Sequence, residues 1–378
     1  MLSGKLPSTK IDTVLVKLAS RCNLDCDYCY VYNMGDDAWR RQPKLMSLEL
    51  IDALGRGLAR LIVAQNAPLS VVFHGGEPLL MGPARFEAIC AAIRAHVGPE
   101  IGLHVQTNGV LLTDGVIDVC ERYDVGISIS IDGPAQVHDR HRVTRTGRGS
   151  HAAVLAAIAR LAAHRAGGTL FSGLLCVIDL AADPAEVYRF LKATGAPSID
   201  FLYRDGNHDQ LPVGKTHRDS AEYGTWMAQL LDVYLGDPAP IRVRVLDDML
   251  RLLLGGHAVK EGIGENAFGI LVVDTDGTVA KNDTLKSAAS GDRFSGSWSV
   301  QDGLDALVAS AEFAAYHRSQ SPSAAACIAC TDLAICGGGM PTHRWSAERG
   351  LDNPSVFCAD QKLLIGQMRA RIGCRDAA

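Results

Sequence analysis

The stretch that decides the fold follows an apolar run at residues 14–19 and reads Ser20-Arg21-Cys22-Asn23-Leu24-Asp25-Cys26-Asp27-Tyr28-Cys29. Its three cysteines have the spacing C-x3-C-x2-C on one short loop. Cysteine thiolates are the ligands that hold iron–sulfur clusters in proteins. A four-iron cluster held by three cysteines leaves one iron free to bind a substrate or cofactor. The loop therefore indicates a reactive site and not merely a structural one.

Two other uses of these cysteines, a zinc site and a disulfide framework, fit the sequence less well. Structural zinc sites generally use four ligands in C-x2-C pairs, and the three-residue gap departs from that pattern. Disulfide frameworks are typical of small secreted domains, whereas this chain has 378 residues. A chance grouping among the 11 cysteines is the remaining alternative.

Composition restricts the partners and the compartment that we expect. The net charge is -5, and no basic run is interleaved with aromatic residues, so we expect no nucleic-acid partner. No run reaches the roughly 18 apolar residues of a membrane span, so we expect no membrane partner. The first ten residues lack the apolar core of a signal peptide. Cysteines in such a chain predict a reducing cytoplasm, where thiols stay free or bind metal.

Strand-like and helix-like segments alternate over the first half of the chain. The candidate strands are residues 13–19, 70–74, 101–106, 125–131, 170–178 and 199–203. Helix-like stretches lie at residues 47–64, 84–97, 151–165 and 184–194, and Ser47 followed by Glu49 is typical of a helix start. This alternation predicts an α/β fold with a parallel sheet and right-handed crossovers. Six repeats predict a partly closed, TIM-like barrel, with the cysteine loop at the carboxyl ends of its strands, where function gathers.

The pattern changes after the sixth strand. Residues 204–215 read as a loop, two helices are expected near 222–235 and 245–254, and a hairpin at 268–273 and 278–281 turns at Asp274-Thr275-Asp276-Gly277. We therefore divide the chain into a short N-terminal segment (1–12), a partial (β/α)6 barrel (13–205), a helical connecting segment (206–260) and a cysteine-rich C-terminal domain (261–378).

The remaining cysteines form one group and four single residues. The C-terminal group consists of Cys327, Cys330, Cys336 and Cys358. The single cysteines lie in apolar or helical contexts, where buried free thiols are expected: Cys90, Cys120, Cys176 and Cys374.

The cysteine loop and the strand ends together resemble the radical S-adenosylmethionine (SAM) enzymes. Tyr28 matches the aromatic residue before the third cysteine of that family, and residues 75–78 match its GGEP motif at the end of the second strand. Residues 107–109 and 128–133 end the third and fourth strands as expected for the family. Residues 141–150 resemble the peptide-modifying branch.

The resemblance implies a ligand set and a chemistry. Cys22, Cys26 and Cys29 would hold a [4Fe–4S] cluster whose open iron binds SAM. The implied SAM contacts are Tyr28, Gly75, Gly76, Glu77, Asn108, Ser128, Ser130 and Arg142. The glycines would let the backbone approach SAM closely, and Glu77 would face its amino group. The two serines would contact its ribose, and Arg142 would pair with its carboxylate. The family cleaves SAM to a 5′-deoxyadenosyl radical that removes a substrate hydrogen.

Plainer roles exist for several of these residues. Glu77 would be a solvated loop carboxylate, Arg142 a surface arginine, and the two serines ordinary strand polarity.

The C-terminal region resembles the SPASM extension of peptide-maturing radical SAM enzymes, which usually carries two auxiliary clusters. Its C-x2-C-x5-C core is present, but Met340 and Asn282 stand where two further cysteines are expected. The resemblance then implies a single auxiliary [4Fe–4S] cluster without an open iron, which favours electron transfer. Its four ligands would be Cys327, Cys330, Cys336 and Cys358. A four-cysteine zinc site is the alternative.

Residues 336–345 and 351–358 look like FxsB-type, cyclophane-forming maturases. This resemblance implies a carbon–carbon crosslink between an aromatic ring and a β-carbon of a ribosomal precursor peptide. An electron donor such as flavodoxin or ferredoxin would be needed. Asp283 and Asp205 are the candidate bases for the proton that the ring loses, and a solvated turn is the alternative for either.

Other functions remain open at this level. A SPASM-type maturase could instead form formylglycine in sulfatases or thioether bonds to cysteine, and a non-enzymatic iron–sulfur electron carrier is a further alternative. About a dozen residues precede the first strand, too few for the winged-helix domain with which many maturases bind a leader peptide. We expect the barrel, the 204–215 segment, the C-terminal region or a separate protein to bind the leader.

Overall fold

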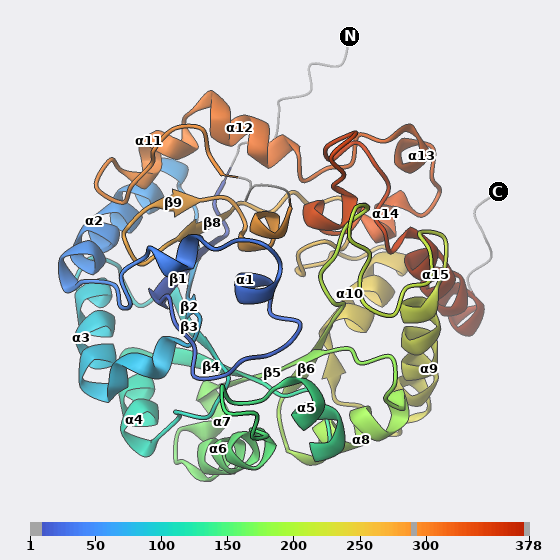
Figure 1. The fold of residues 1–378 in the computed structure, drawn as a ribbon, viewed down its shortest axis with the longest axis horizontal. Helices are drawn as coiled ribbons and strands as arrows, with labels where there is room; N and C mark the ends of the chain where they lie inside the picture. Colours follow the sequence, from blue (N-terminus) through green and yellow to red (C-terminus); the bar gives the residue numbers. More distant parts are fainter. Residues whose placement is uncertain (1–9, 289–292, 374–378) are drawn as a thin grey trace.

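The computed structural model describes residues 10–288 and 293–373, and one curved nine-stranded sheet forms its centre (Figure 1). The strand order is β7-β6-β5-β4-β3-β2-β1-β8-β9. Six parallel strands form the barrel, each within one residue of its predicted place: β1 (Thr13–Ala19), β2 (Ser70–Gly75), β3 (Gly102–Thr107), β4 (Val125–Ser130), β5 (Phe171–Val177) and β6 (Ser198–Leu202). The predicted α/β partial barrel is confirmed.

Helices surround the sheet on its outer face (Figure 1). They are α2 (Leu48–Gln65), α3 (Gly82–Arg94), α4 (Asp114–Tyr123), α6 (His151–Ala163), α8 (Pro184–Ala193) and α9 (Glu222–Gly236). The hydroxyl of Ser47 caps α2 by accepting a hydrogen bond from the Leu50 N–H at 3.2 Å, as the sequence predicted. The sequence reading missed α4, whose buried residues are Val116, Ile117, Val119 and Cys120.

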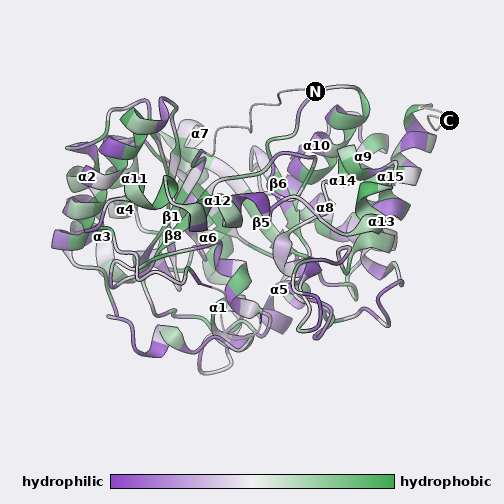
Figure 2. Cartoon of the chain, turned by 90° about the horizontal axis from the view of Figure 1, so that it is seen from above, coloured by the Kyte–Doolittle hydropathy of each residue, from purple (hydrophilic) through white to green (hydrophobic). Residues whose placement is uncertain are grey.

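The short elements near the sheet's carboxyl edge include α1 (Tyr30–Asn33), η1 (Ala38–Arg40), η2 (Pro78–Met81) and α5 (Ala135–His141). Figure 2 shows α1 and α5 together at one end of the barrel. A single turn, α7 (Gly167–Leu170), precedes β5. After the barrel, β7 (Arg242–Val243) pairs with β6 and leads into α10 (Arg244–Leu253).

The predicted hairpin forms, but it belongs to the barrel sheet. β8 (Ile270–Val273) and β9 (Val279–Ala280) pair in antiparallel fashion, and the Gly277 N–H donates to the Asp274 carbonyl at 2.9 Å. Gly277 has a φ of +85°, a conformation that favours glycine. β8 also pairs in parallel with β1, so the sheet continues past residue 261, where we placed the start of the cysteine-rich domain.

The C-terminal region consists mainly of short helices around the second cysteine group. They are η3 (Asp283–Ser287), α11 (Leu304–Val308), α12 (Ala311–Arg318), α13 (Ala325–Ile328), α14 (Leu333–Cys336), η4 (Pro341–Arg344) and α15 (Cys358–Ile372). α15 lies against α9 (Figure 1). The Lys215 ammonium lies 2.5 Å from the Asp360 carboxylate, and both side chains are fully buried. This pair ties the 204–215 loop to the C-terminal region, because breaking a buried ion pair typically costs about 3–5 kcal/mol.

The single cysteines Cys90, Cys120 and Cys176 are buried free thiols, as expected, and Cys374 lies outside the described residues. Within the described part of the chain, no helix combines the length and the apolar character that crossing a membrane requires.

The loops that follow β1 and β2 approach each other very closely. The Gly76 N–H donates to the Ala19 carbonyl at 2.8 Å, and the Glu77 N–H donates to the Arg21 carbonyl at 2.9 Å. A Cβ on Gly75 would lie 2.3 Å from the Ala19 oxygen, and one on Gly76 would lie 2.3 Å from the Arg21 oxygen. The close packing of these two loops therefore requires glycine at both positions, whether or not a ligand binds nearby.

We expect Gly76→Ala to lower the stability of the protein by about 1–3 kcal/mol, the usual range for overpacking. Gly366→Ala is the matched control, because a Cβ there meets no atom within 4 Å, and alanine in α15 should stabilise by about 0.5–1 kcal/mol. The apparent melting temperature of anaerobically prepared protein measures both. A Gly76→Ala protein that melts like the parent chain would contradict the required close approach.

Candidate functional site

A cavity of about 200 Å³ opens where the strands end, and the three-cysteine loop lines it. The predicted contacts Tyr28, Gly75, Gly76, Glu77, Asn108, Ser130 and Arg142 line it too, as does Asp205. Ser128 lies two residues before Ser130 on β4 but is not part of the lining, and neither is Asp283. Sequence reasoning missed Gln106, Tyr203 and Arg204, whose only signal was their position at the ends of β3 and β6.

Burial keeps the cysteines of this loop protonated as long as no metal binds them. Burial raises the pKa of Cys22 to about 12 and that of Cys26 to about 11, and the charges of neighbouring thiolates contribute in the same direction. A metal cluster reverses this effect, because a coordinating thiol is deprotonated by the metal charge. The Leu24 N–H points at the Cys22 sulfur at 3.4 Å, so the loop already offers a donor to a sulfur ligand.

The spacing of the sulfurs separates a cluster from a single zinc ion. Within residues 10–288 and 293–373, no three cysteine sulfurs lie within 4.8 Å of one another. One zinc ion, about 2.3 Å from each sulfur in a tetrahedral site, would hold the sulfurs about 3.8 Å apart. A polynuclear cluster sets its cysteines farther apart, because each binds a different iron.

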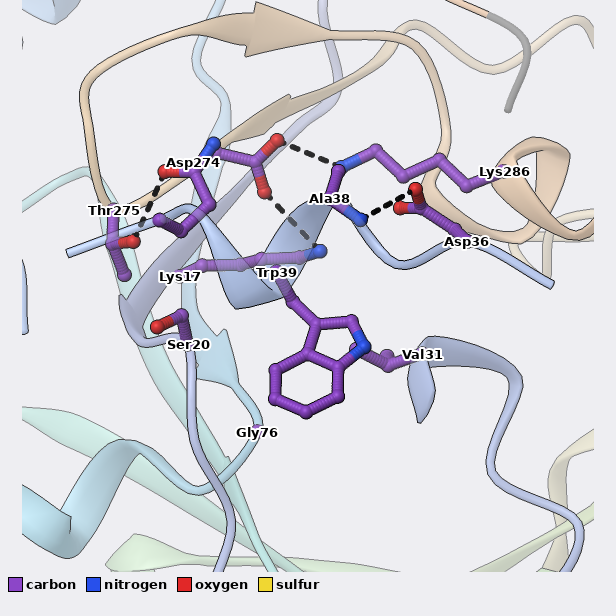
Figure 3. Close-up of a pocket in the computed structure, with 11 residues that line it drawn as sticks. Lys17, Ser20, Val31, Asp36, Ala38, Trp39, Gly76, Asp274, Thr275 and Lys286 are labelled. Carbon is purple, nitrogen blue, oxygen red and sulfur yellow. Dashed lines mark hydrogen bonds and ion pairs between the residues drawn. The ribbon is translucent and has the colours of Figure 1, made fainter. Parts of the chain in front are cut away.

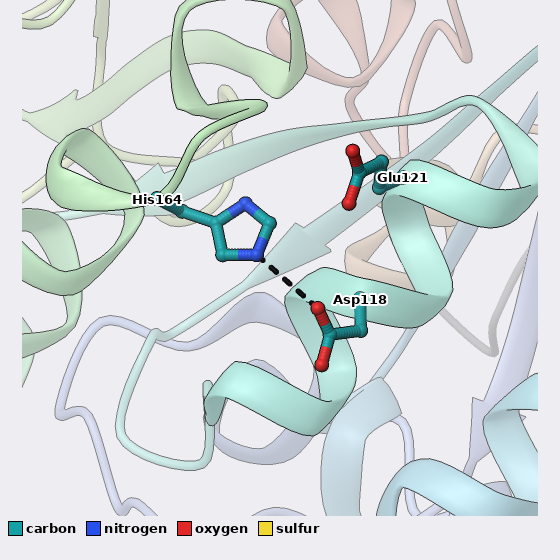
Figure 4. Close-up of side chains that lie close together, drawn as sticks. All are labelled: Asp118, Glu121 and His164. Carbon is teal, nitrogen blue, oxygen red and sulfur yellow. Dashed lines mark hydrogen bonds and ion pairs between the residues drawn. The ribbon is translucent and has the colours of Figure 1, made fainter.

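One other group of possible metal ligands lies on the surface (Figure 4). His164 Nε2 is 3.3 Å from Asp118 Oδ1, and Glu121 lies beside them. Both oxygens of Glu121 accept hydrogen bonds from the Arg165 guanidinium, at 2.7–3.0 Å. The guanidinium already neutralises Glu121, so we assign this group to surface ion pairing.

Glu77 is a fully buried carboxylate at the end of β2. It accepts hydrogen bonds from the Thr107 hydroxyl at 2.7 Å, the Asn108 N–H at 2.8 Å and the Leu79 N–H at 3.0 Å. Burial raises the pKa of Glu77, although these three bonds act in the opposite direction. All three donors are neutral, and Arg142, whose charge also lowers the pKa of Glu77, donates its hydrogen bond to Tyr28 instead. The amino group of a ligand in the cavity would supply a cationic partner.

Arg142 lies at the end of α5 and is also buried. It donates to the Tyr28 hydroxyl at 2.8 Å, which in turn donates to Asp132 at 2.5 Å. Although burial opposes it, the charges of Tyr28 and Asp132 hold the pKa of Arg142 above its ordinary value. The buried Nε of Arg142 has no hydrogen-bond partner. A cation with a spare donor at the cavity wall suits a ligand carboxylate.

Asn108 and Ser130 have partners within the protein. The Asn108 amide donates to Asn23 at 2.7 Å and points at the Cys22 sulfur at 3.7 Å, so it holds the cysteine loop. The Ser130 hydroxyl accepts from Gln106 at 2.9 Å. Gln106 therefore positions Ser130 at the cavity.

The two candidate bases have different surroundings. The side chain of Asp205 lines the cavity and is 19% exposed, and His343 Nε2 lies 3.6 Å from it. Asp283 is buried 2.7 Å from the Lys17 ammonium and 3.1 Å from the Lys286 ammonium. Burial alone would raise the pKa of Asp283, but the two lysines hold it well below its usual range.

The Asp283 surroundings form a charge-balanced cluster. Asp274 lies 3.2 Å from the Lys17 ammonium and 2.7 Å from the Lys286 ammonium, and Figure 3 shows both lysines converging on it. Two lysines and two aspartates thus join β1, the turn after β8 and η3. Burial raises the pKa of Tyr30, which lines the cavity, and the charge of Asp283 acts in the same direction.

The four C-terminal cysteines line a second cavity, next to Gln361 and Lys362. Asn282 and Met340 stand where the second auxiliary cluster of the SPASM extension would need cysteines. The Asn282 amide donates to Glu261 at 2.5 Å, and Met340 packs beside Gly262. Burial raises the pKa of Glu261 to about 7. An amide, a thioether and a carboxylic acid thus occupy this region.

Comparisons with known proteins agree with this architecture. Residues 16–191 match the radical SAM superfamily. The chain is similar to the cysteine-type anaerobic sulfatase-maturating enzyme of Clostridium perfringens, with 23% identity over 71% of this chain and 73% of that protein. It is similar to the serine-type enzyme of Bacteroides thetaiotaomicron, with 30% identity over 66% of this chain and 64% of that protein.

Two solved structures share the fold. Native anSMEcpe with bound AdoMet has a TM-score of 0.80 at 22% identity, covering 95% of this chain and 98% of that chain. Streptococcus suis SuiB bound to precursor peptide SuiA has a TM-score of 0.60 at 12% identity, covering 88% of this chain and 72% of that chain.

We expect Arg142→Met to weaken SAM binding about 10- to 100-fold, because a charge-assisted hydrogen bond contributes about 1.5–3 kcal/mol. Arg140→Met on the same helix is the control, since Arg140 is exposed and already paired with Asp179. Equilibrium dialysis of cluster-loaded protein measures the affinity, and iron content and circular dichroism verify folding. If Arg142→Met and the parent chain bound SAM with equal affinity, Arg142 would not be a SAM contact.

Proposed function

We propose that this chain, which is similar to radical SAM proteins and to the anaerobic sulfatase-maturating enzymes, matures a ribosomally synthesised peptide by forming a carbon–carbon crosslink. The crosslink would join an aromatic ring carbon to a β-carbon. One observation carries the proposal: the cavity at the three-cysteine loop lies next to the four-cysteine site, with two aromatic rings in contact between them.

The residues of the cavity fit SAM and a three-cysteine cluster. When bound, these two groups would supply the radical chemistry that removes a hydrogen atom from a peptide β-carbon. Cys22, Cys26 and Cys29 would hold the cluster. Glu77 would balance the amino group of SAM, and Arg142 would pair with its carboxylate.

The contact between the two sites supports an electron-accepting role for the C-terminal cluster. The Tyr203 ring lines the cavity and lies 4.5 Å from the Phe357 ring, and Phe357 directly precedes Cys358. The Tyr203 hydroxyl also accepts a hydrogen bond of 3.4 Å from Gln361, which lines the four-cysteine cavity. Forming a crosslink to an arene requires the loss of one electron and one proton, and this path leads away from the cavity.

Asp205 is the better placed of the two candidate proton acceptors. It faces the cavity, and a cavity residue can reach a substrate directly. Asp283 is a weak base, because its two lysine partners stabilise the carboxylate, and a general base works best with a pKa near the operating pH. We therefore propose Asp205 as the base.

Two further proposals concern the setting of the reaction. A small one-electron carrier such as flavodoxin or ferredoxin would reduce the three-cysteine cluster in the cytoplasm. Residues 336–345, which suggested cyclophane formation, contact the cavity lining, because His343 lies 3.6 Å from Asp205.

Formylglycine formation is the second candidate function, because the similar curated proteins include cysteine-type and serine-type sulfatase-maturating enzymes. A non-enzymatic electron carrier is the third. Release of 5′-deoxyadenosine by dithionite-reduced protein separates both enzymatic proposals from the carrier.

The decisive experiment co-expresses the chain with the peptide of a neighbouring short reading frame that has an aromatic-x-x motif near its C-terminus. We expect a loss of two hydrogens, located in one aromatic-x-x segment by fragmentation, with every cysteine thiol still alkylatable. A hydrazide probe should find no aldehyde, since oxidising a serine to formylglycine gives the same mass loss. An aldehyde in a sulfatase-derived peptide would favour the second candidate.

Asp205→Asn should still release 5′-deoxyadenosine from SAM but yield at least tenfold less crosslinked peptide, because general-base catalysis typically contributes about 10²–10⁴-fold. Asp283→Asn should mainly lower the melting temperature, since it leaves two buried lysines beside one aspartate. Single-turnover product yield per 5′-deoxyadenosine is the measurement. If Asp205→Asn gave as much crosslinked peptide as the parent chain and Asp283→Asn gave none, Asp283 and not Asp205 would be the base.

A further inference from the structure

Arg344, at the end of η4, is a completely buried arginine with no carboxylate beside it. Its side chain is fully enclosed, and one terminal nitrogen donates to the Ser319 carbonyl at 2.8 Å and the Gln320 carbonyl at 2.7 Å. Its Nε has no hydrogen-bond partner. Among the described residues, no carboxylate forms an ion pair with it. Such burial is costly unless a negative charge lies close by.

The segment that Arg344 binds lies against the four-cysteine site, because Pro322, two residues after Gln320, packs on Gly338, which lines that cavity. Burial lowers the pKa of Arg344 to about 10, and the charges of Cys327 and Cys336 act in the opposite direction. The guanidinium is thus a fixed positive charge beside this site.

We propose that Arg344 is the countercharge of the auxiliary iron–sulfur cluster and raises its reduction potential. The inference rests on the four-cysteine cluster of the proposed function. Reduction adds one electron, and with it one negative charge, to the cluster. A nearby cation in a medium of low dielectric constant favours the reduced form. In turnover the electron would come from the crosslinked arene, which gives its proton to the base, and the cluster would pass the electron on to a carrier protein.

The other cations around this site differ from Arg344. Lys362 lines the same cavity, but its side chain is exposed, so solvent screens its charge. Arg369 lies 2.5 Å from Asp332 and is compensated by that carboxylate. Arg344 alone among these three is both buried and without a carboxylate.

A structural role is the competing explanation, since Arg344 also holds the two carbonyls that follow α12. That role would change stability but not the potential of the cluster. The reduction potential therefore separates the two explanations.

The test is a redox titration of anaerobically reconstituted full-length protein, with the paramagnetic signal of each reduced cluster followed by electron paramagnetic resonance. Added SAM perturbs the signal of the three-cysteine cluster and so identifies it. We expect Arg344→Met to shift the auxiliary potential to more negative values, Arg344→Lys to retain most of the parent value, and Lys362→Met to shift it much less. The potential of the three-cysteine cluster should stay constant and serves as the internal reference.

Iron analysis keeps the two proposals apart. About eight irons per chain are expected for two four-iron clusters, whereas about four irons plus zinc would overturn the auxiliary cluster itself. With eight irons bound, an Arg344→Met shift no larger than that of Lys362→Met would overturn the role of Arg344. If Arg344→Met fails to assemble the cluster, Arg344→Gln, which keeps a donor for the two carbonyls, is titrated under the same expectations.

Discussion

Two backbone hydrogen bonds between the loop after β1 and the loop after β2 set the geometry on which the site depends. They run from Gly76 to Ala19 and from Glu77 to Arg21, and they form only because residues 75 and 76 have no Cβ. One loop carries the three cysteines and the other carries the Glu77 carboxylate. The same contact therefore fixes the metal ligands and the candidate amino-group partner with respect to each other.

The buried charges of this protein fall into two classes. Some are balanced within the chain, as in the Lys215–Asp360 pair and the lysine–aspartate cluster around Asp283. Others form no ion pair among the described residues or lack a full set of partners, as do the Glu77 carboxylate and the guanidinium of Arg344. Because unpaired buried charge is unfavourable, the second class marks the places where we expect bound groups. It lies at the two cysteine sites.

The C-terminal region is joined to the barrel in a way that places the second cysteine site close to the cavity. Its first strand, β8, extends the barrel sheet, and its last helix, α15, packs against α9. Between them, Phe357 meets Tyr203 at the end of β6. The barrel and the C-terminal region are thus in direct contact between the two cysteine-lined cavities.

The sequence by itself determined the barrel, because β and α periodicities are local and strand ends carry recognisable motifs. It also identified the two cysteine groups and many of the residues that line the cavity. Tertiary structure decided the features that depend on distant partners. Lys17 and Lys286 form ion pairs with Asp283, and the Tyr203 ring contacts the Phe357 ring. Motif spacing records the order of residues along the chain, whereas pairing of buried charges and rings depends on how distant segments pack.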